Sequence, residues 1–185
     1  MGQNFRSRKL KLKKHHGWKA KPGNAICVID RGAIRFDYPE SWDLSVNEGQ
    51  IDIRDRPKPD DNCVLSVSRM YLPFEVADQV PLRDLAQTAM MEDAGETLER
   101  KPAVDVSRQD GIELAYIESR YIEKNERREA LTRLAVARGS GVYCLITFSF
   151  WADDQAKCDP VWEETLRSLT LGLYSEDPTV GPVVQ

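Results

Sequence analysis

The stretch VYCLITFSFW, which spans Val142–Trp151, decides which fold this sequence can adopt. Its even-numbered positions are all apolar, and this alternation predicts one buried face of a β-strand. Tyr143, Leu145 and Trp151 lie on the other face, which is therefore largely apolar as well. An antiparallel strand with two apolar faces is expected near the centre of a sheet that is covered on both sides.

Further β-rich runs lie upstream of this strand. They are Ala25–Asp30, Ile34–Tyr38, Trp42–Val46, Ile51–Ile53, Cys63–Leu72, Ala103–Ser107, Leu114–Glu123 and Arg128–Arg138. Asp110 and Gly111 are typical of a tight hairpin turn, so we expect the run that ends at Ser107 to pair with the run that follows this turn. Most of the chain is thus predicted to form antiparallel strands.

Charged residues predict the register of the longest hairpin. If Glu123 faces Arg128 across a four-residue tip, the same register pairs Glu118 with Arg133 and Glu113 with Arg138. Opposite charges on directly facing residues stabilise a strand pair. Three such pairs in one register are unlikely to arise by chance.

Two helices are expected in separate parts of the chain. Pro81 opens the first, which has apolar residues at helical spacing and a possible end at Gly95. The second is predicted to begin at Asp159–Pro160, with aspartate as N-cap and proline in the first turn, and to end at Leu169. An antiparallel sheet with two helices is an α+β fold, and the two-sided strand favours an α/β/α sandwich over a two-layer arrangement.

The order of these elements resembles that of PsbP-like domains. Residues 34–42, IRFDYPESW, resemble the F-x-Y-P-x-x-W opening of those domains, and Tyr143–Phe150 followed by a helix ending at Leu166–Leu169 resembles their last part. The resemblance covers about residues 25–173 and implies the α/β/α sandwich. It also implies a non-enzymatic binding role, since the relatives include an extrinsic photosystem II subunit, a Ran-binding transport factor, envelope lipoproteins and toxin chaperones.

The charge is unevenly distributed along the chain. The net charge is −4, and residues 1–22 contain eight cations and no acidic residue, so the other 163 residues carry −12. We expect a basic tail (1–22), one domain (23–174) and a loose C-terminal tail (175–185). The residues predicted to contact a polyanion or a protein partner are Arg6, Arg8, Lys9, Lys11, Lys13, Lys14, Trp18 and Lys19. The alternatives are a solvated extension with little packing of its own and a tail docked on the acidic body.

The sequence offers few groups for catalysis. Its only histidines, His15 and His16, lie in the basic tail, which removes Ser-His-Asp and Cys-His catalysis and most histidine-ligated metal sites from the body. The carboxylates of 52–56 and 153–154 could bind a hard cation, but solvated loop charges are the favoured interpretation. We therefore predict no catalytic residue, no cofactor, no metal ligand and no enzymatic activity.

Four cysteines are expected to be free thiols. Cys63 and Cys144 lie in apolar alternating runs with no neighbouring cation and are predicted to be buried and unreactive, whereas Cys158, just before the predicted helix start, should be more accessible. No apolar run is long enough to span a bilayer, and the basic tail lacks the apolar core of a secretory signal, so we expect a cytoplasmic protein.

These observations favour a non-enzymatic protein-binding module that acts as an adaptor, assembly factor or chaperone. The alternative is a nucleic-acid-associated protein that binds RNA or DNA through the basic tail. A hydrolase without histidine is a third and weaker hypothesis. The sequence leaves the protein partner and the oligomeric state open.

Overall fold

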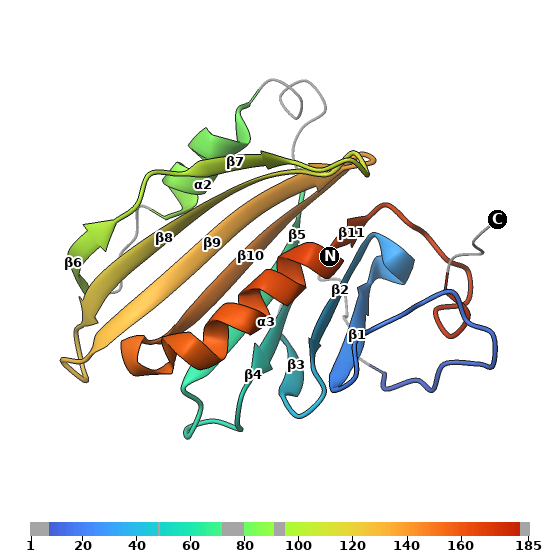
Figure 1. Cartoon of the computed structure of the whole chain (residues 1–185), viewed down its shortest axis with the longest axis horizontal. Helices are drawn as coiled ribbons and strands as arrows, with labels where there is room; N and C mark the ends of the chain where they lie inside the picture. The colour runs from blue at the N-terminus through green and yellow to red at the C-terminus, as the bar shows by residue number, and fades with distance from the viewer. Residues whose placement is uncertain (1–7, 48, 72–79, 91–94, 182–185) are drawn as a thin grey trace.

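In the part of the chain that the structure describes, two antiparallel sheets pack with two α-helices (Figure 1). The computed structural model describes residues 8–47, 49–71, 80–90 and 95–181. The larger sheet contains, in spatial order, β3 (Asp43–Asn47), β4 (Gln50–Arg54), β5 (Cys63–Met70), β10 (Val142–Trp151), β9 (Glu129–Gly139), β8 (Glu113–Glu123) and β6 (Gly95–Arg100), with β7 (Val104–Ser107) also paired to β8. The smaller sheet contains β1 (Asn24–Ile29), β2 (Ile34–Pro39) and β11 (Thr170–Leu171), and the short 3-10 helix η1 (Asp30–Gly32) joins β1 to β2.

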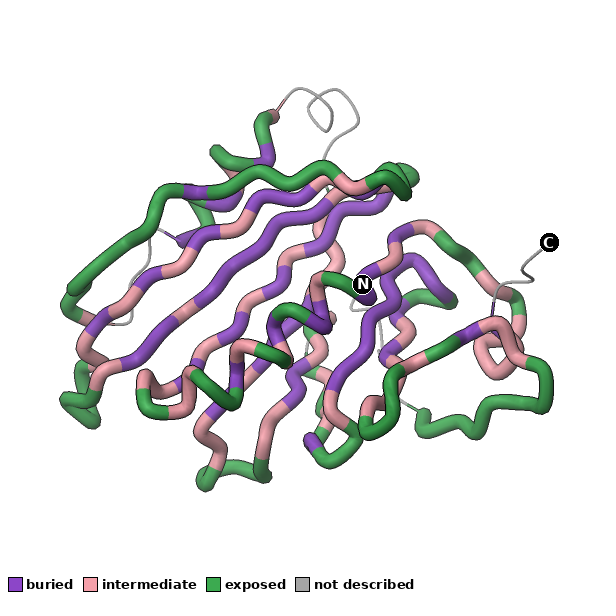
Figure 2. The backbone as a smooth tube through the Cα atoms, in the orientation of Figure 1, coloured by how far each residue is buried: buried purple, intermediate pink, exposed green. Residues whose placement is uncertain are grey.

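The central strand β10 separates two apolar cores, as its two-sided pattern predicts. Its even-numbered residues pack into one core with the small sheet and with helix α3 (Gln155–Ser168). Tyr143 and Leu145 face the second core, beneath helix α2 (Leu82–Ala89). The buried strands of the large sheet therefore lie between layers on both faces (Figures 1 and 2). This arrangement confirms the α+β fold and the α/β/α sandwich.

The predicted register of the β8–β9 hairpin is also confirmed. Glu118 faces Arg133 and Glu113 faces Arg138, and each pair is joined by a carboxylate–guanidinium contact of 2.6 Å. At the tip, the backbone N–H of Glu123 donates to the carbonyl of Arg128 over 2.9 Å, in the same register. There the Arg128 side chain turns away and pairs with Asp153.

Two element boundaries differ from the sequence prediction. Helix α3 begins at Gln155, four residues before the predicted start, and Pro160 lies inside it. Pro160 is the sixth residue of the helix, where its missing N–H leaves the carbonyl oxygen of Ala156 without its usual helical partner. Gly95 does not end α2 but opens β6, where an added Cβ would lie 1.9 Å from the carbonyl oxygen of Ile122. Glycine therefore allows the close approach of the two strands.

All four cysteines are buried, so the prediction of an accessible Cys158 is wrong. The early start of α3 places Cys158 within its second turn, on the face that packs against β5. Its sulfur lies 3.1 Å from the sulfur of Cys63. Cys63 and Cys144 are buried as predicted.

Candidate protein interface

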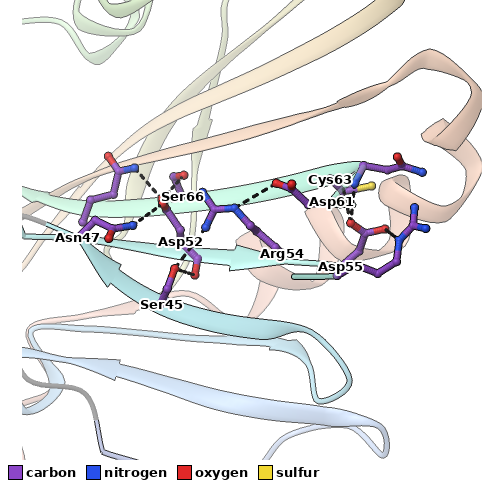
Figure 3. A network of polar contacts seen from close by, with 11 residues as sticks. Ser45, Asn47, Asp52, Arg54, Asp55, Asp61, Cys63 and Ser66 are labelled. Atoms are coloured by element: carbon purple, nitrogen blue, oxygen red, sulfur yellow. Dashed lines mark hydrogen bonds and ion pairs between the residues drawn. The ribbon is translucent and has the colours of Figure 1, made fainter. Parts of the chain in front are cut away.

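Asp52 and Asp55, two of the carboxylates that the sequence raises as possible cation ligands, belong to an internal polar network (Figure 3), whereas the side chain of Asp153 is 83% exposed. Asp52 is buried and accepts hydrogen bonds from Gln50 (2.7 Å), Ser66 (2.7 Å), Arg54 (2.9 Å) and Asn47 (3.0 Å). Burial alone would raise the pKa of Asp52, but these donors hold it far below its ordinary value. The interpretation of these residues as solvated charges is therefore wrong for Asp52. In the described part of the chain, no group of three potential ligands could hold a metal ion.

The second half of the basic tail packs on the C-terminal segment. The backbone N–H of Lys13 donates to Thr179 O over 3.0 Å, and that of Gly17 donates to Val180 O over 2.6 Å. The Lys13 ammonium contacts the Asp177 carboxylate at 2.6 Å. We call residues 13–18 and 177–181 the terminal clamp. Up to Gly181, the expectation of a loose C-terminal tail is therefore wrong.

Trp18 is the centre of this clamp. Only 3% of the residue is exposed, and its indole N–H donates to Pro178 O over 3.2 Å. The Arg35 guanidinium lies 5.6 Å from the centre of the indole ring and donates to the carbonyl oxygen of Lys19 over 2.8 Å. The prediction that the tail has little packing is thus wrong for this part. Because Trp18 is buried, it cannot stack on a nucleic-acid base without leaving its site.

The other predicted contact residues are not gathered into one site. Arg6 lies outside the described residues. Lys13 is engaged in the terminal clamp. The remaining cations are exposed along the tail: Arg8, Lys9, Lys11, Lys14 and Lys19.

A turn with unusual backbone geometry lies at the other end of β1. Asp30 and Arg31 have φ angles of 47° and 57°, a left-handed region that residues with a side chain rarely occupy. Gly32 follows with a φ of 103° and lies so close to Leu173 that an added Cβ would be 2.2 Å from its carbonyl oxygen. The backbone N–H of Ser175 also donates to Arg31 O over 2.8 Å. The chain after β11 therefore holds this turn in place. Strained backbone of this kind concentrates at functional sites.

Exposed aromatic and basic side chains surround this turn. Tyr71 is 67% exposed, Tyr174 57% and Leu173 45%. The Arg69 guanidinium lies 5.1 Å from the centre of the Tyr71 ring and 3.3 Å from the Asp30 carboxylate. Burial lowers the pKa of Arg69, but Asp30 and the hydroxyls of Tyr174 and Tyr71 outweigh it and raise that pKa. Arg69 thus lies against the Tyr71 ring and beside the turn that Leu173 and Tyr174 approach at Gly32. We call Arg31, Arg69, Tyr71, Leu173 and Tyr174 the tyrosine–arginine patch.

The chemistry of this patch suits binding better than catalysis. Tyrosine and arginine are enriched at the energetic centres of protein interfaces, because they combine apolar area with hydrogen-bonding groups. The patch contains no histidine, cysteine or serine nucleophile among its members. The sequence does not reveal it, because Tyr71 and Tyr174 are about a hundred positions apart and neither belongs to a motif.

Comparison with known proteins places the chain among relatives without an assigned activity. A family model described as Alr1449 matches residues 25–175. A relative from Nostoc sp., named "Uncharacterized protein alr1449", is 38% identical over 173 residues, which are 93% of this chain and 90% of the relative.

Three solved structures share the fold at low identity. A Bacteroides thetaiotaomicron protein has a TM-score of 0.56 and 15% identity and covers 80% of this chain, which spans only 48% of that protein. Cyanobacterial PsbP from Synechocystis sp. has a TM-score of 0.55 and 17% identity, with 84% of this chain and 98% of that one covered. LpqN of Mycobacterium tuberculosis, described as involved in cell envelope biogenesis, has a TM-score of 0.52 and 10% identity, with coverage of 80% and 89%. The fold is therefore PsbP-like. Among the described residues, no helix is long and apolar enough to cross a membrane.

Proposed function

The chain belongs to the Alr1449 family, and we propose that it is a non-catalytic protein-binding module that contacts its partner through the tyrosine–arginine patch. The observation that carries this proposal is the combination of two exposed tyrosines and Leu173 with a strained turn held in place by the chain. A preformed surface loses little conformational entropy on binding, so more of its contact energy appears as affinity.

The charges of the patch indicate what kind of surface it fits. Arg31 is exposed, and Arg69 is only partly neutralised by Asp30, to which it lies 3.3 Å away. The partner should therefore present an apolar centre for the tyrosines and acidic side chains at the rim. Adaptor, assembly and chaperone roles all require such a reversible contact, and all three fall within this proposal.

Site-specific photo-crosslinking tests the proposal. Tyr174 is replaced by benzoylphenylalanine in the cells that naturally produce the protein, and crosslinked proteins are identified by mass spectrometry. We expect one dominant protein partner, retained after nuclease treatment. Leu98 is a matched control position, because it is also exposed (51%) but lies on β6, at the opposite edge of the molecule (Figure 1).

The paired variant Tyr71→Ala/Tyr174→Ala should reduce recovery of that partner by about tenfold or more, since each hot-spot tyrosine contributes at least about 1 kcal/mol. Leu98→Ala should leave recovery unchanged. Equal crosslinking of the same protein from position 98, or an unchanged yield from the paired variant, would show that the patch is not the interface.

A second candidate function is binding of a nucleic acid through the tail. It is supported by the five exposed cations at positions 8, 9, 11, 14 and 19. A chain that begins at Lys13 lacks Arg6, Arg8, Lys9 and Lys11 and should bind a fluorescent single-stranded RNA with a salt-dependence slope smaller by about 3. An unchanged slope in fluorescence anisotropy would remove this candidate.

A further inference from the structure

Helix α3 and strand β5 bring two cysteines together that are 95 positions apart in sequence. The sulfurs of Cys63 and Cys158 are separated by 3.1 Å, and the two residues are 1% and 0% exposed. A disulfide bond is about 2.05 Å long, so its formation requires an approach of only about 1 Å. Such an approach is within the reach of small side-chain rotations.

A polar bridge through Asp55 holds the backbone around the two cysteines, and Figure 3 shows its contact with Cys63. The carboxylate of Asp55 accepts hydrogen bonds from the backbone N–H groups of Asn62 (2.9 Å) and Cys63 (3.0 Å). Its other oxygen contacts the ammonium of Lys157, the residue before Cys158, at 2.7 Å. One side chain therefore ties the start of β5 to the first turns of α3, and each cysteine is next to a tied residue.

A shallow pocket of about 170 Å³ lies beside the pair. Cys63 is among the residues that line it, together with Val64, Ser149 and Trp151, and Cys158 is not. The pocket gives a small oxidant a route toward the two buried sulfurs from the side of Cys63.

We propose that Cys63 and Cys158 form a disulfide modification site that is oxidised by hydrogen peroxide. The Cys63 thiolate attacks a peroxide oxygen and breaks the O–O bond, which gives a sulfenic acid and, with the thiol proton, one water molecule. The Cys158 thiolate then attacks the Cys63 sulfur, forms the S–S bond and releases hydroxide, which takes the Cys158 proton as a second water molecule. In total, two thiols are oxidised and one peroxide is reduced.

The same chain supplies two control thiols. Cys27 and Cys144 are also buried, and burial raises the pKa of each to about 12. Within the described part of the chain, no sulfur–sulfur contact joins either of them to another cysteine. Burial is therefore matched between the two sets, whereas the neighbouring sulfur, the pocket and the Asp55 bridge belong to the Cys63–Cys158 pair. This inference is independent of the proposed function.

Mass spectrometry of the full chain, before and after digestion, tests the proposal. The reduced protein is treated with hydrogen peroxide, unfolded, labelled with N-ethylmaleimide and digested. We expect two labels instead of four, a linked peptide pair that contains Cys63 and Cys158, and labelled Cys27 and Cys144. Because the crosslink closes a long loop, the oxidised protein should melt about 10 °C higher than the reduced one.

Two variants give the test a matched contrast. Cys158→Ala should keep all three remaining thiols out of disulfides and show no rise in Tm on oxidation, whereas Cys27→Ala should still form the crosslink. The wild-type mass result needs no variant and stays decisive if a variant folds poorly. Four labelled cysteines after oxidation, or a disulfide with any other pairing, would overturn the proposal.

Discussion

Glu164 illustrates how a single side chain couples the tail to the domain. Its carboxylate contacts the Arg167 guanidinium, one helical turn away, and the Lys21 ammonium at 2.5 Å. Arg167 is the main cause that holds the pKa of Glu164 at about 2, against the opposing effect of burial and with further help from Lys21. A carboxylate with a lowered pKa stabilises the folded state fully above its ordinary pKa of 4.5 and loses that effect as the pH falls toward 2.

Glu164→Gln should therefore destabilise the protein at pH 7, by about 1 kcal/mol, because both cationic partners are largely exposed and screened. The stability difference from wild type should shrink as the pH falls from 4.5 toward 2. Urea unfolding at several pH values measures it. Glu163→Gln removes the same charge at the neighbouring exposed position and should change stability little at any pH.

Gly32 determines the geometry of the tyrosine–arginine patch. Gly32→Ala should cost about 3 kcal/mol, since it adds left-handed strain and a collision with the carbonyl of Leu173. Gly111→Ala is the matched control: its φ is also positive (79°), but no atom lies within 4 Å of the new Cβ, so only about 1 kcal/mol should be lost. Equal losses in denaturant unfolding would show that the contact with Leu173 is not tight.

The burial of a single residue could be predicted from sequence where its neighbours along the chain determine the environment of its side chain. The apolar alternation around Cys63 and Cys144 was enough to predict their burial. Cys158 and Trp18 were misjudged, because their environments come from partners far away in sequence: the Cys63 sulfur for one, and Pro178 and Arg35 for the other. The same reason hides the patch, whose tyrosines meet only in the folded chain.

At the scale of elements, the β8–β9 hairpin offers two ion pairs that differ in exposure and in their further partners, since Glu118 also contacts Lys101 and Arg133 also contacts Asp159. The side chains of Glu118 and Arg133 are 14% and 11% exposed, and those of Glu113 and Arg138 are 47% and 27%. Double-mutant cycles with glutamine should give a coupling energy of about 2 kcal/mol for the inner pair and less than about 1 kcal/mol for the outer pair. Equal coupling energies, measured by chemical unfolding, would mean that exposure does not control these pairs.

Elements were predictable when periodicity and charge agreed. The two-faced pattern of β10 and the five-residue spacing of charges in β8 and β9 gave the central strands and their register. The start of α3 was not predictable in this way. A proline that is taken as the opening of a helix can also lie a few residues inside it. Strand β6, with the sequence GETLER, has no alternating apolar face and is a strand because it pairs with β8.

At the scale of the whole molecule, the terminal clamp divides the basic tail into two parts. Residues 1–12 are proposed to bind a polyanion, and the residues from Lys13 onward stabilise the fold. Removing residues 1–12 should leave the melting temperature unchanged within about 1 °C, because the clamp begins at Lys13. Removing residues 1–22 should lower it by about 8 °C, since the burial of Trp18 is lost. Calorimetry of the two truncated chains decides between this outcome and a tail that contributes nothing to stability.

The overall architecture could be anticipated because a two-sided strand admits few layer arrangements. The division into two sheets could not, since β2 pairs with β11, about 135 positions later in the chain. No local pattern records such a pairing. The terminal clamp is likewise a contact between the two ends of the sequence.

The terminal clamp also sets an order on biosynthesis. Strands β3 to β10 occupy a continuous part of the chain, so the large sheet can assemble while the ribosome is still translating. Trp18 must wait for Pro178, which is synthesised 160 positions later, and β2 must wait for Thr170 and Leu171. Until these residues are made, the nascent protein carries a paired large sheet beside an unsealed apolar core. The synthesis of residues 170–178 is therefore the event that allows the small sheet and the clamp to close.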